Sequence, residues 1–367
     1  MGSQPFDWIA GGAGEEWTLR ANREAFHRWS LRPRILTGNA ERDLSIDILG
    51  AHVPGPWLLA PIGAQTLAHP DGELAVARAA AAAGVPLIVS QAASFSMEEI
   101  AAACGEGSRW YQLYWVNDRE VVESLVDRAI SSGYRAIVLT VDTPVVGLRD
   151  RDERNAYSPF RMGHGIGQYT SDPVFRRGLG MVTEESPRAA ADAVARMFPN
   201  LSLTWKDISW LRSRTDLPLL IKGILTAEDA RRSRDAGFDG IVVSNHGGRQ
   251  LDGVAASLDA LPEVRNALGD DAVVLMDSGI RRGTDVVKAL ALGADAVLLG
   301  RPYIYGLAVG GQAGVEHVLR TMMAEIDHAL ALVGARSTRE VDRTYISPGQ
   351  GPGPVFASLA GRGPPTN

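Results

Sequence analysis

Short apolar segments recur along most of the chain, and each is followed by a polar or glycine position and then by a stretch of helical character. Most are rich in valine, isoleucine and leucine without strict alternation, which is typical of parallel strands buried on both faces. We predict eight strands from them, over residues 57–62, 86–90, 110–114, 136–142, 217–223, 240–245, 272–279 and 296–302. Strands that alternate with helices predict an α/β protein, either a closed (β/α)8 TIM barrel or an open doubly wound sheet. We favour the barrel, partly because no G-x-G-x-x-G turn follows the first strand.

Helix signals lie between these strands. We predict a helix over 71–84 with Asp71 as its N-cap, and another that begins with a capping box at Ser96. Two more helices are predicted over 226–237 and 283–293, because both stretches end on glycine. Polar or glycine residues stand at the ends of all eight predicted strands, which is where barrel enzymes gather their chemistry.

Three segments lie outside the repeat of strands and helices. Residues 11–26 indicate a glycine turn that leads into a helix. Residues 147–216 are too long for an ordinary connection after the fourth strand, so we expect an insertion there, with residues 161–175 suited to a lid. We therefore predict a single barrel domain over residues 1–345, followed by a mobile tail rich in proline and glycine over residues 346–367.

The composition narrows the classes of function. The net charge is −6 without any basic block, which argues against a nucleic-acid partner. Cys104 is the only cysteine, so an internal disulfide and a cysteine-built zinc or iron–sulfur site are excluded, and we expect no metal. No apolar run approaches the roughly 20 residues of a membrane helix. The chain begins without an export leader either. We therefore expect no membrane partner and a cytoplasmic location.

The two loops after the last predicted strands offer a phosphate site. Gly279, Gly283 and Gly300 allow close backbone approach, while Arg281 and Arg301 supply forked donors for an anion. Glycine turns with solvent-facing arginines are the structural alternative.

A second site is indicated after the sixth strand, where His246 and Arg249 are separated by two glycines. Histidine can take a proton near neutral pH and arginine can bind a carboxylate, which together suit a hydroxyl group next to a carboxylate. Asp142, after the fourth strand, could orient the imidazole or cap a helix. Lys222 closes the fifth strand in a chain with only three lysines, and could stabilise developing negative charge or form a Schiff base.

These segments resemble those of the FMN-dependent enzymes that oxidise L-2-hydroxy acids, the glycolate oxidase and lactate oxidase family. The most specific motif is SNHGGRQ at residues 244–250, and the resemblance covers almost the whole chain. It includes residues 11–26, 60–73, 112–114, 140–155, 221–225 and 277–302. Within the family, the chain is most similar to lactate 2-monooxygenase. That likeness rests on residues 169–179, 203–213, 300–311 and on Gly63, where the oxidases usually carry alanine.

The resemblance implies a role for each candidate residue. His246 would be the catalytic base and Asp142 its charged partner, while Tyr114 would bind the substrate. Arg249 and Arg149 would bind the substrate carboxylate. The residues expected to contact FMN are Pro61, Ile62, Gly63, Ser90, Gln112, Thr140, Lys222, Ser244, Asp277, Gly279, Arg281, Gly300 and Arg301.

Trp8 is a departure from the family pattern. It stands where family members commonly have a tyrosine whose hydroxyl binds the substrate carboxylate. An indole N–H donates from another position and with more bulk, which points to a different side-chain preference.

The resemblance also implies a reaction. A lactate-like or mandelate-like acid would be oxidised to its keto acid by hydride transfer or by a carbanion route. Dioxygen would reoxidise the flavin, with release of peroxide or coupled decarboxylation, and another acceptor would make the protein a dehydrogenase. A homotetramer or homo-octamer is expected.

The alternatives to this class of enzyme are another phosphate-binding barrel enzyme, such as one like inosinate dehydrogenase, and a flavin-binding barrel without turnover. The former needs a nucleophilic cysteine in a loop, whereas Cys104 ends a predicted helix.

Overall fold

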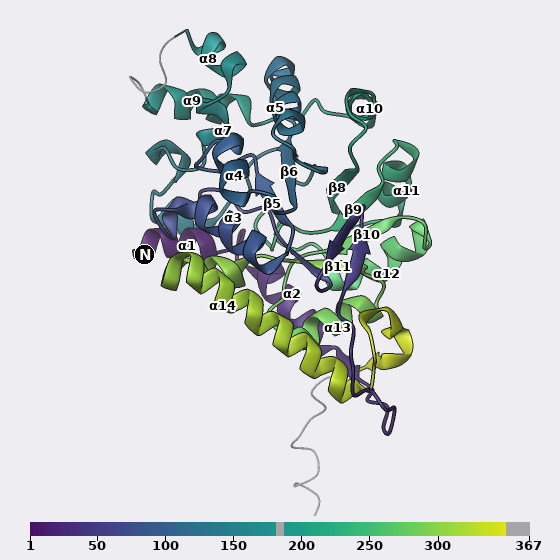
Figure 1. Cartoon of the computed structure of the whole chain (residues 1–367). Coiled ribbons are helices and arrows are strands. Elements are labelled where there is room, and N and C mark those ends of the chain that lie inside the picture. Colours follow the sequence, from purple (N-terminus) through teal and green to yellow (C-terminus); the bar gives the residue numbers. More distant parts are fainter. Residues whose placement is uncertain (181–186, 350–367) are drawn as a thin grey trace, which may run out of the picture.

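The computed structural model describes residues 1–180 and 187–349. Its centre is a closed barrel of eight parallel strands, in which β11 pairs with β4 to complete the ring (Figure 1). The strands are β4 (Trp57–Leu59), β5 (Leu87–Ser90), β6 (Arg109–Tyr114), β7 (Ile137–Thr140), β8 (Leu219–Ile224), β9 (Gly240–Val243), β10 (Val273–Met276) and β11 (Ala296–Leu299). Each overlaps one of the eight predicted segments, so the TIM-barrel prediction is confirmed and the open sheet is wrong.

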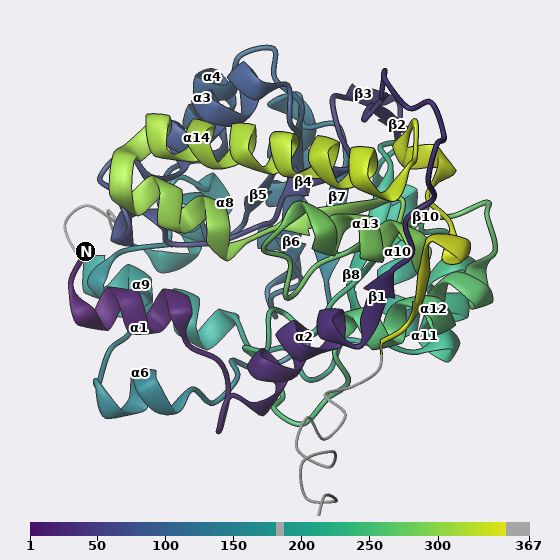
Figure 2. The same ribbon diagram turned by 90° about the horizontal axis from the view of Figure 1, so that it is seen from below.

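A helix follows each barrel strand in the outer layer. These helices are α3 (Gly72–Ala83), α4 (Met97–Cys104), α5 (Arg119–Ser131), α10 (Trp205–Arg214), α11 (Ala227–Asp235), α12 (Ser257–Leu268), α13 (Gly283–Ala291) and α14 (Arg301–Val333). The long α14 packs against both α13 and α3 and so closes the helical ring (Figure 2). The capping box of Ser96 is present, but the side chain of Asp71 makes no cap and instead accepts a hydrogen bond from Arg78.

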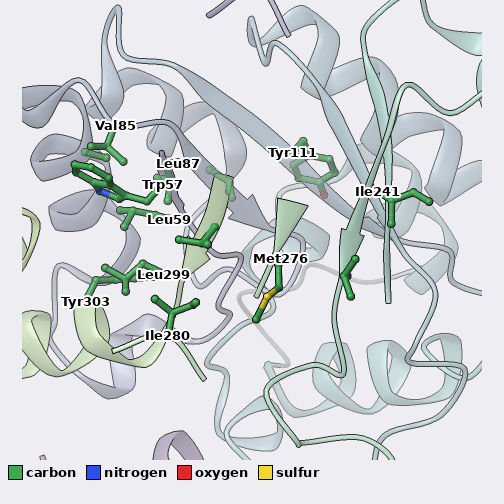
Figure 3. Packing of buried hydrophobic residues seen from close by; sticks show 14 of the residues in the cluster. Trp57, Leu59, Val85, Leu87, Tyr111, Ile241, Met276, Ile280, Leu299 and Tyr303 are labelled. Atoms are coloured by element: carbon green, nitrogen blue, oxygen red, sulfur yellow. The ribbon is translucent and has the colours of Figure 1, made fainter. Parts of the chain in front are cut away.

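Two layers of apolar side chains hold the barrel together. Alternate strand residues such as Leu58 and Val242 point inward, where the hairpin of β2 (Ile46–Ile48) and β3 (Ala51–Val53) packs against them. The intervening residues point outward to the helices, and Figure 3 shows part of this outer layer. Because alternate residues of each strand are buried on opposite faces, the strands read as continuous apolar runs in the sequence.

The predicted insertion contains several short helices before α10. They are α6 (Asp150–Arg154), α7 (Gly167–Thr170), α8 (Pro173–Leu179) and α9 (Pro187–Met197). Its last part, α10, belongs to the outer layer of the barrel, since Arg214 of this helix forms an ion pair with Asp127 of α5. Residues 181–186 of the predicted insertion lie outside the described ranges.

The two ends of the described chain meet in a small sheet. The predicted helix near the N-terminus is present as α2 (Trp17–His27), and α1 (Ser3–Ala10) precedes it. β1 (Trp29–Leu31) pairs with β12 (Ile346–Pro348), so the first residues of the predicted tail form a strand. The remainder of the tail, from residue 350, lies outside the described residues. Within the described ranges, no helix is long and apolar enough to cross a membrane.

Candidate active site

A cavity of about 380 Å³ opens at the carboxyl ends of the barrel strands. Such a volume is within the range of small-molecule sites. The predicted site residues that line it are Trp8, Pro61, Ile62, Gly63, Ser90, Tyr114, Arg149, Lys222, His246, Arg249, Asp277, Gly279, Arg281, Gly300 and Arg301. The other five, Gln112, Thr140, Asp142, Ser244 and Gly283, are not among its lining residues. The N–H of Gly283 donates instead to Oε2 of Glu325 at 2.9 Å. The fold therefore brings residues from distant parts of the chain around one space.

His246 and Asp142 form a hydrogen-bonded pair in which the histidine can accept a proton. The Nδ1 of His246 lies 2.8 Å from Oδ1 of Asp142, which places the proton on Nδ1 and leaves Nε2 free to accept one. Burial lowers the pKa of His246, and Lys222 and Arg149 lower it further against the opposing effect of Asp142. Burial alone would raise the pKa of Asp142, but His246 and Lys222 lower it to about 2. At neutral pH the imidazole is therefore a free base beside a carboxylate.

Lys222 is buried at the end of β8 and is held on two sides. Its Nζ donates to Oγ of Ser244 at 2.8 Å and lies 3.3 Å from Oδ2 of Asp277. Burial disfavours its charge, but the carboxylates of Asp277 and Asp142 outweigh burial and raise its pKa. The side chain is therefore a fixed cation. A Schiff base needs a neutral amine, so this charge disfavours the covalent alternative.

Two arginines supply positive charge beside the imidazole. Arg249 donates through Nη1 to the carbonyl oxygens of Trp8 and Gly11, at 2.6 and 2.9 Å. No carboxylate forms an ion pair with it in the described ranges, and burial together with Arg149 lowers its pKa well below the usual value. Arg149 is held by the carbonyl oxygen of Arg249 at 3.2 Å and faces Asp152 at 3.8 Å. This concentration of buried cations favours an anionic ligand.

A second anion site lies at the start of α14. This helix begins after Gly300 without a side-chain cap, and the positive end of its dipole favours an anion there. Arg301 donates to three carbonyl oxygens, including that of Gly247 at 3.1 Å, and Arg281 lies close enough to lower its pKa. Burial is the larger cause and brings the pKa of Arg301 to about 10, so it remains a cation at neutral pH.

Two buried polar atoms of β6 and β7 test whether this part of the barrel fits a flavin. Nε2 of Gln112 and Oγ1 of Thr140 have no hydrogen-bond partner in the described structure. Buried polar groups are normally paired, so both atoms call for a polar ligand. Together with Lys222, Asp277 and the arginine-lined end of α14, they fit a flat polar ring that carries a phosphate chain. The residues present therefore fit FMN.

Several residues of the site did not stand out in the sequence. Gln250 donates from Nε2 to the carbonyl oxygen of Asp142 at 3.1 Å and so links the loops after β7 and β9. Its position inside the SNHGGRQ motif could have identified Gln250 as a site residue from the sequence. Asn22 and Asn245 exchange side-chain hydrogen bonds of 2.8 and 2.9 Å, and only the structure brings these distant residues together. Phe160 and Phe198 also line the cavity, and they belong to segments with no strong pattern.

The fold and site together define a barrel enzyme with a mononucleotide cleft next to a histidine–aspartate pair. Comparison with known proteins agrees: the family described as FMN-dependent dehydrogenase matches residues 1–348, and the chain belongs to this family. FMN is therefore its cofactor.

Three relatives illustrate the similarity. L-lactate oxidase of Lysinibacillus sphaericus (strain C3-41) is 45% identical over 333 residues, which cover 91% of this chain and 86% of that protein. Glycolate oxidase 3 of Arabidopsis thaliana is 46% identical over 341 residues, covering 93% and 90%. A crystal structure of mandelate oxidase has 42% identity and a TM-score of 0.84, and the match covers 95% of this chain and 94% of that one. The predicted family is thus confirmed.

Proposed function

We propose that the protein oxidises an L-2-hydroxy acid to the 2-keto acid with FMN as cofactor and dioxygen as final electron acceptor. The observation that carries this proposal is the meeting of the His246–Asp142 pair with Arg249 in one cavity. A base beside a cation is what a hydroxyl group next to a carboxylate requires. The relatives that are named lactate, glycolate and mandelate oxidases support the same class of reaction.

Arg249 and Arg149 bind the substrate carboxylate in this proposal. Both guanidiniums are buried. Arg249 forms no ion pair in the described ranges and Arg149 faces Asp152 at 3.8 Å, so a substrate anion relieves the repulsion between the two arginines. Tyr114 lines the same cavity and is electrostatically coupled to both arginines. Its hydroxyl is placed to bind the substrate oxygen as a neutral phenol, because burial raises its pKa.

His246 takes the proton of the substrate hydroxyl at Nε2. The resulting imidazolium is stabilised by Asp142, whose carboxylate contacts the opposite ring nitrogen at 2.8 Å. When bound, FMN supplies the acceptor for the hydrogen and electron pair that leave the α-carbon. Lys222 provides a fixed positive charge near that acceptor, held by Asp277 at 3.3 Å.

Coupled oxidative decarboxylation, as in lactate 2-monooxygenase, is the second candidate outcome. It is supported by Gly63, whose position leaves no space for the alanine that the oxidases usually carry. A Cβ there would lie 2.6 Å from the carbonyl oxygen of Ala92. Release of peroxide would make the protein a simple oxidase, and transfer to another acceptor would make it a dehydrogenase. The cytoplasmic location and the homotetramer or homo-octamer also stay predictions.

Two measurements test the proposal. Holoenzyme mixed with L-lactate or L-mandelate without oxygen should lose its yellow colour, while the D-enantiomers should leave it yellow. A yellow protein that no 2-hydroxy acid bleaches would instead favour a flavin-binding barrel without turnover. Under air, peroxide and keto acid in equal amounts identify an oxidase, and the acid shortened by one carbon identifies the monooxygenase. Bleaching that persists under air, with one keto acid formed per flavin and no peroxide, identifies a dehydrogenase.

A further inference from the structure

Four aromatic rings form two walls of the cavity. Trp8 and Phe160 meet edge to face, with ring centres 6.3 Å apart and an interplanar angle of 81°. Tyr114 and Phe198 meet in the same manner at 5.0 Å and 67°. All four side chains line the cavity, although they come from α1, β6 and two parts of the insertion.

The aromatic walls adjoin the cation that is expected to bind the carboxylate. The guanidinium carbon of Arg249 lies 4.9 Å from the centre of the Trp8 ring. Tyr114 belongs to the other ring pair and influences the charge of the same guanidinium. A ligand anchored by its carboxylate on Arg249 therefore lies in the cavity that both ring pairs line.

Helix α9 completes the apolar surround with small side chains. Val194 and Ala195 of this helix line the same cavity as Phe160 and Phe198. The cavity lining thus combines aromatic rings with small apolar side chains. Rings arranged in this manner interact favourably with an additional ring inserted between them.

Building on the proposed function, we propose that the preferred substrate is a 2-hydroxy acid with an aryl group on or next to its α-carbon. The carboxylate lies on Arg249, the hydroxyl faces His246, and the aryl group packs between the two ring pairs. Trp8 and Phe198 are then the residues that determine specificity. A methyl group, as in lactate, would leave both aromatic walls in contact with water.

Binding of unreactive acids tests this directly. Phenylacetate and propionate correspond to mandelate and lactate without their hydroxyl groups, so neither can be oxidised. Titration into the holoenzyme, followed by the change in flavin absorbance, should give a dissociation constant at least about 10-fold lower for phenylacetate, as expected for an apolar pocket that accepts the larger group. Equal affinity for the two acids would overturn the proposal.

Variants of the residues in the two ring pairs distinguish a change in substrate specificity from a general loss of activity. Phe198→Leu should lower the ratio of kcat/KM for L-mandelate over L-lactate by about 10-fold. Phe198→Tyr keeps the ring and should keep the ratio. Trp8→Tyr adds a hydroxyl beside Arg249 and should lower the KM for L-lactate. The matched control is Phe6→Leu, since Phe6 lies on the same helix as Trp8 but is 46% exposed and faces away from the cavity, stacked on Tyr305.

The outcomes distinguish this proposal from the one on which it rests. If neither acid reduces the flavin, the proposed function fails. If L-lactate is oxidised as well as or better than L-mandelate, the oxidase activity stands and the aryl preference is wrong. If Phe198→Leu folds with full FMN content and keeps the wild-type ratio, the assignment of Phe198 is overturned.

Discussion

The charge of one imidazole decides whether this site can accept a proton. Burial and Lys222 lower the pKa of His246, whereas Asp142 opposes them. The base is thus neutral at physiological pH, and the carboxylate becomes most useful when the ring is protonated during the reaction.

Asp142→Asn should slow substrate oxidation about 100-fold or more, because the imidazolium loses its counter-charge. The same change removes an interaction that raises the pKa of His246, so the acid limb of the pH profile should move to lower pH. The rate of anaerobic flavin reduction between pH 4 and 8 measures both effects. Asp47→Asn, in the exposed pair of Asp47 with His52, is the control. An unmoved acid limb would remove Asp142 as the partner of the base.

Glu73 is a buried carboxyl group that the proposed reaction does not use. Burial raises its pKa from 4.5 to about 7, although the N–H groups of Gln65 and Ser94 donate to its Oε1. Its Oε2 has no partner in the described structure. Because the folded protein holds this proton more tightly than the unfolded chain, Glu73 costs stability as the pH rises from about 4.5 to about 7.

Glu73→Gln should remove the loss of stability that accompanies ionisation of Glu73 as the pH rises, since glutamine keeps the oxygen acceptor and cannot ionise. The difference in unfolding free energy between variant and wild type should grow in favour of the variant by roughly 2 kcal/mol between pH 5 and 7. Denaturant titrations at a series of pH values measure it. Exposed Glu106→Gln should show no such trend, and a constant difference across the range would contradict the assigned pKa.

At the level of elements, the predicted lid is anchored to the barrel over much of its length. Gly165 donates from its N–H to Oγ of Ser94 at 3.1 Å, and Gly167 donates to the carbonyl oxygen of Ala93 at 2.9 Å. Further along, buried Asp172 forms an ion pair with Arg128 of α5 at 3.1 Å. This part of the insertion therefore forms a wall that is hydrogen-bonded to the barrel, and its action as a lid stays a prediction.

Gly167→Ala should destabilise the protein by about 1–3 kcal/mol. A Cβ at this position would lie 2.3 Å from the carbonyl oxygen of Ser94, so the wall must move away from the barrel. Gly178→Ala is the matched control, because its Cβ meets no atom within 4 Å and alanine favours a helix. Thermal unfolding should show a lower Tm for the first variant and an equal or higher Tm for the second. Equal values would show that the contact is not needed.

The sequence predicted the barrel because its strands are apolar on both faces and its polar residues follow them directly. Lys222, His246 and Arg249 could be placed at the site for that reason. The anchoring of the insertion could not be predicted, since the partners of Gly167 and Asp172 lie on distant segments. The aromatic walls escaped prediction in the same way, because a ring beside a cavity looks like any core aromatic until the fold is known.

For the whole molecule, the cofactor is part of the stabilising structure. Without FMN, Gln112 and Thr140 keep buried unpaired atoms and the arginines repel one another. At a free FMN concentration of about 100 Kd, the folded state should gain roughly 2.7 kcal/mol. Removal of FMN should lower the Tm by several degrees, and FMN but not adenosine monophosphate should restore it. A Tm that does not depend on FMN would exclude the cleft as its site.

The carbonyl oxygens at the end of α1 accept hydrogen bonds from the guanidinium groups of two arginines. Arg249 and Arg301 both donate to the oxygen of Gly11, each at 2.9 Å. Burial, Arg149 and Arg301 together lower the pKa of Arg249, so an anion at one guanidinium eases the repulsion felt by the other. The phosphate and the hydroxy acid should therefore bind with reciprocal cooperativity. Protein loaded with riboflavin, which lacks the phosphate, should hold phenylacetate more weakly than the FMN form does, and equal affinity would show that the two anions are energetically independent.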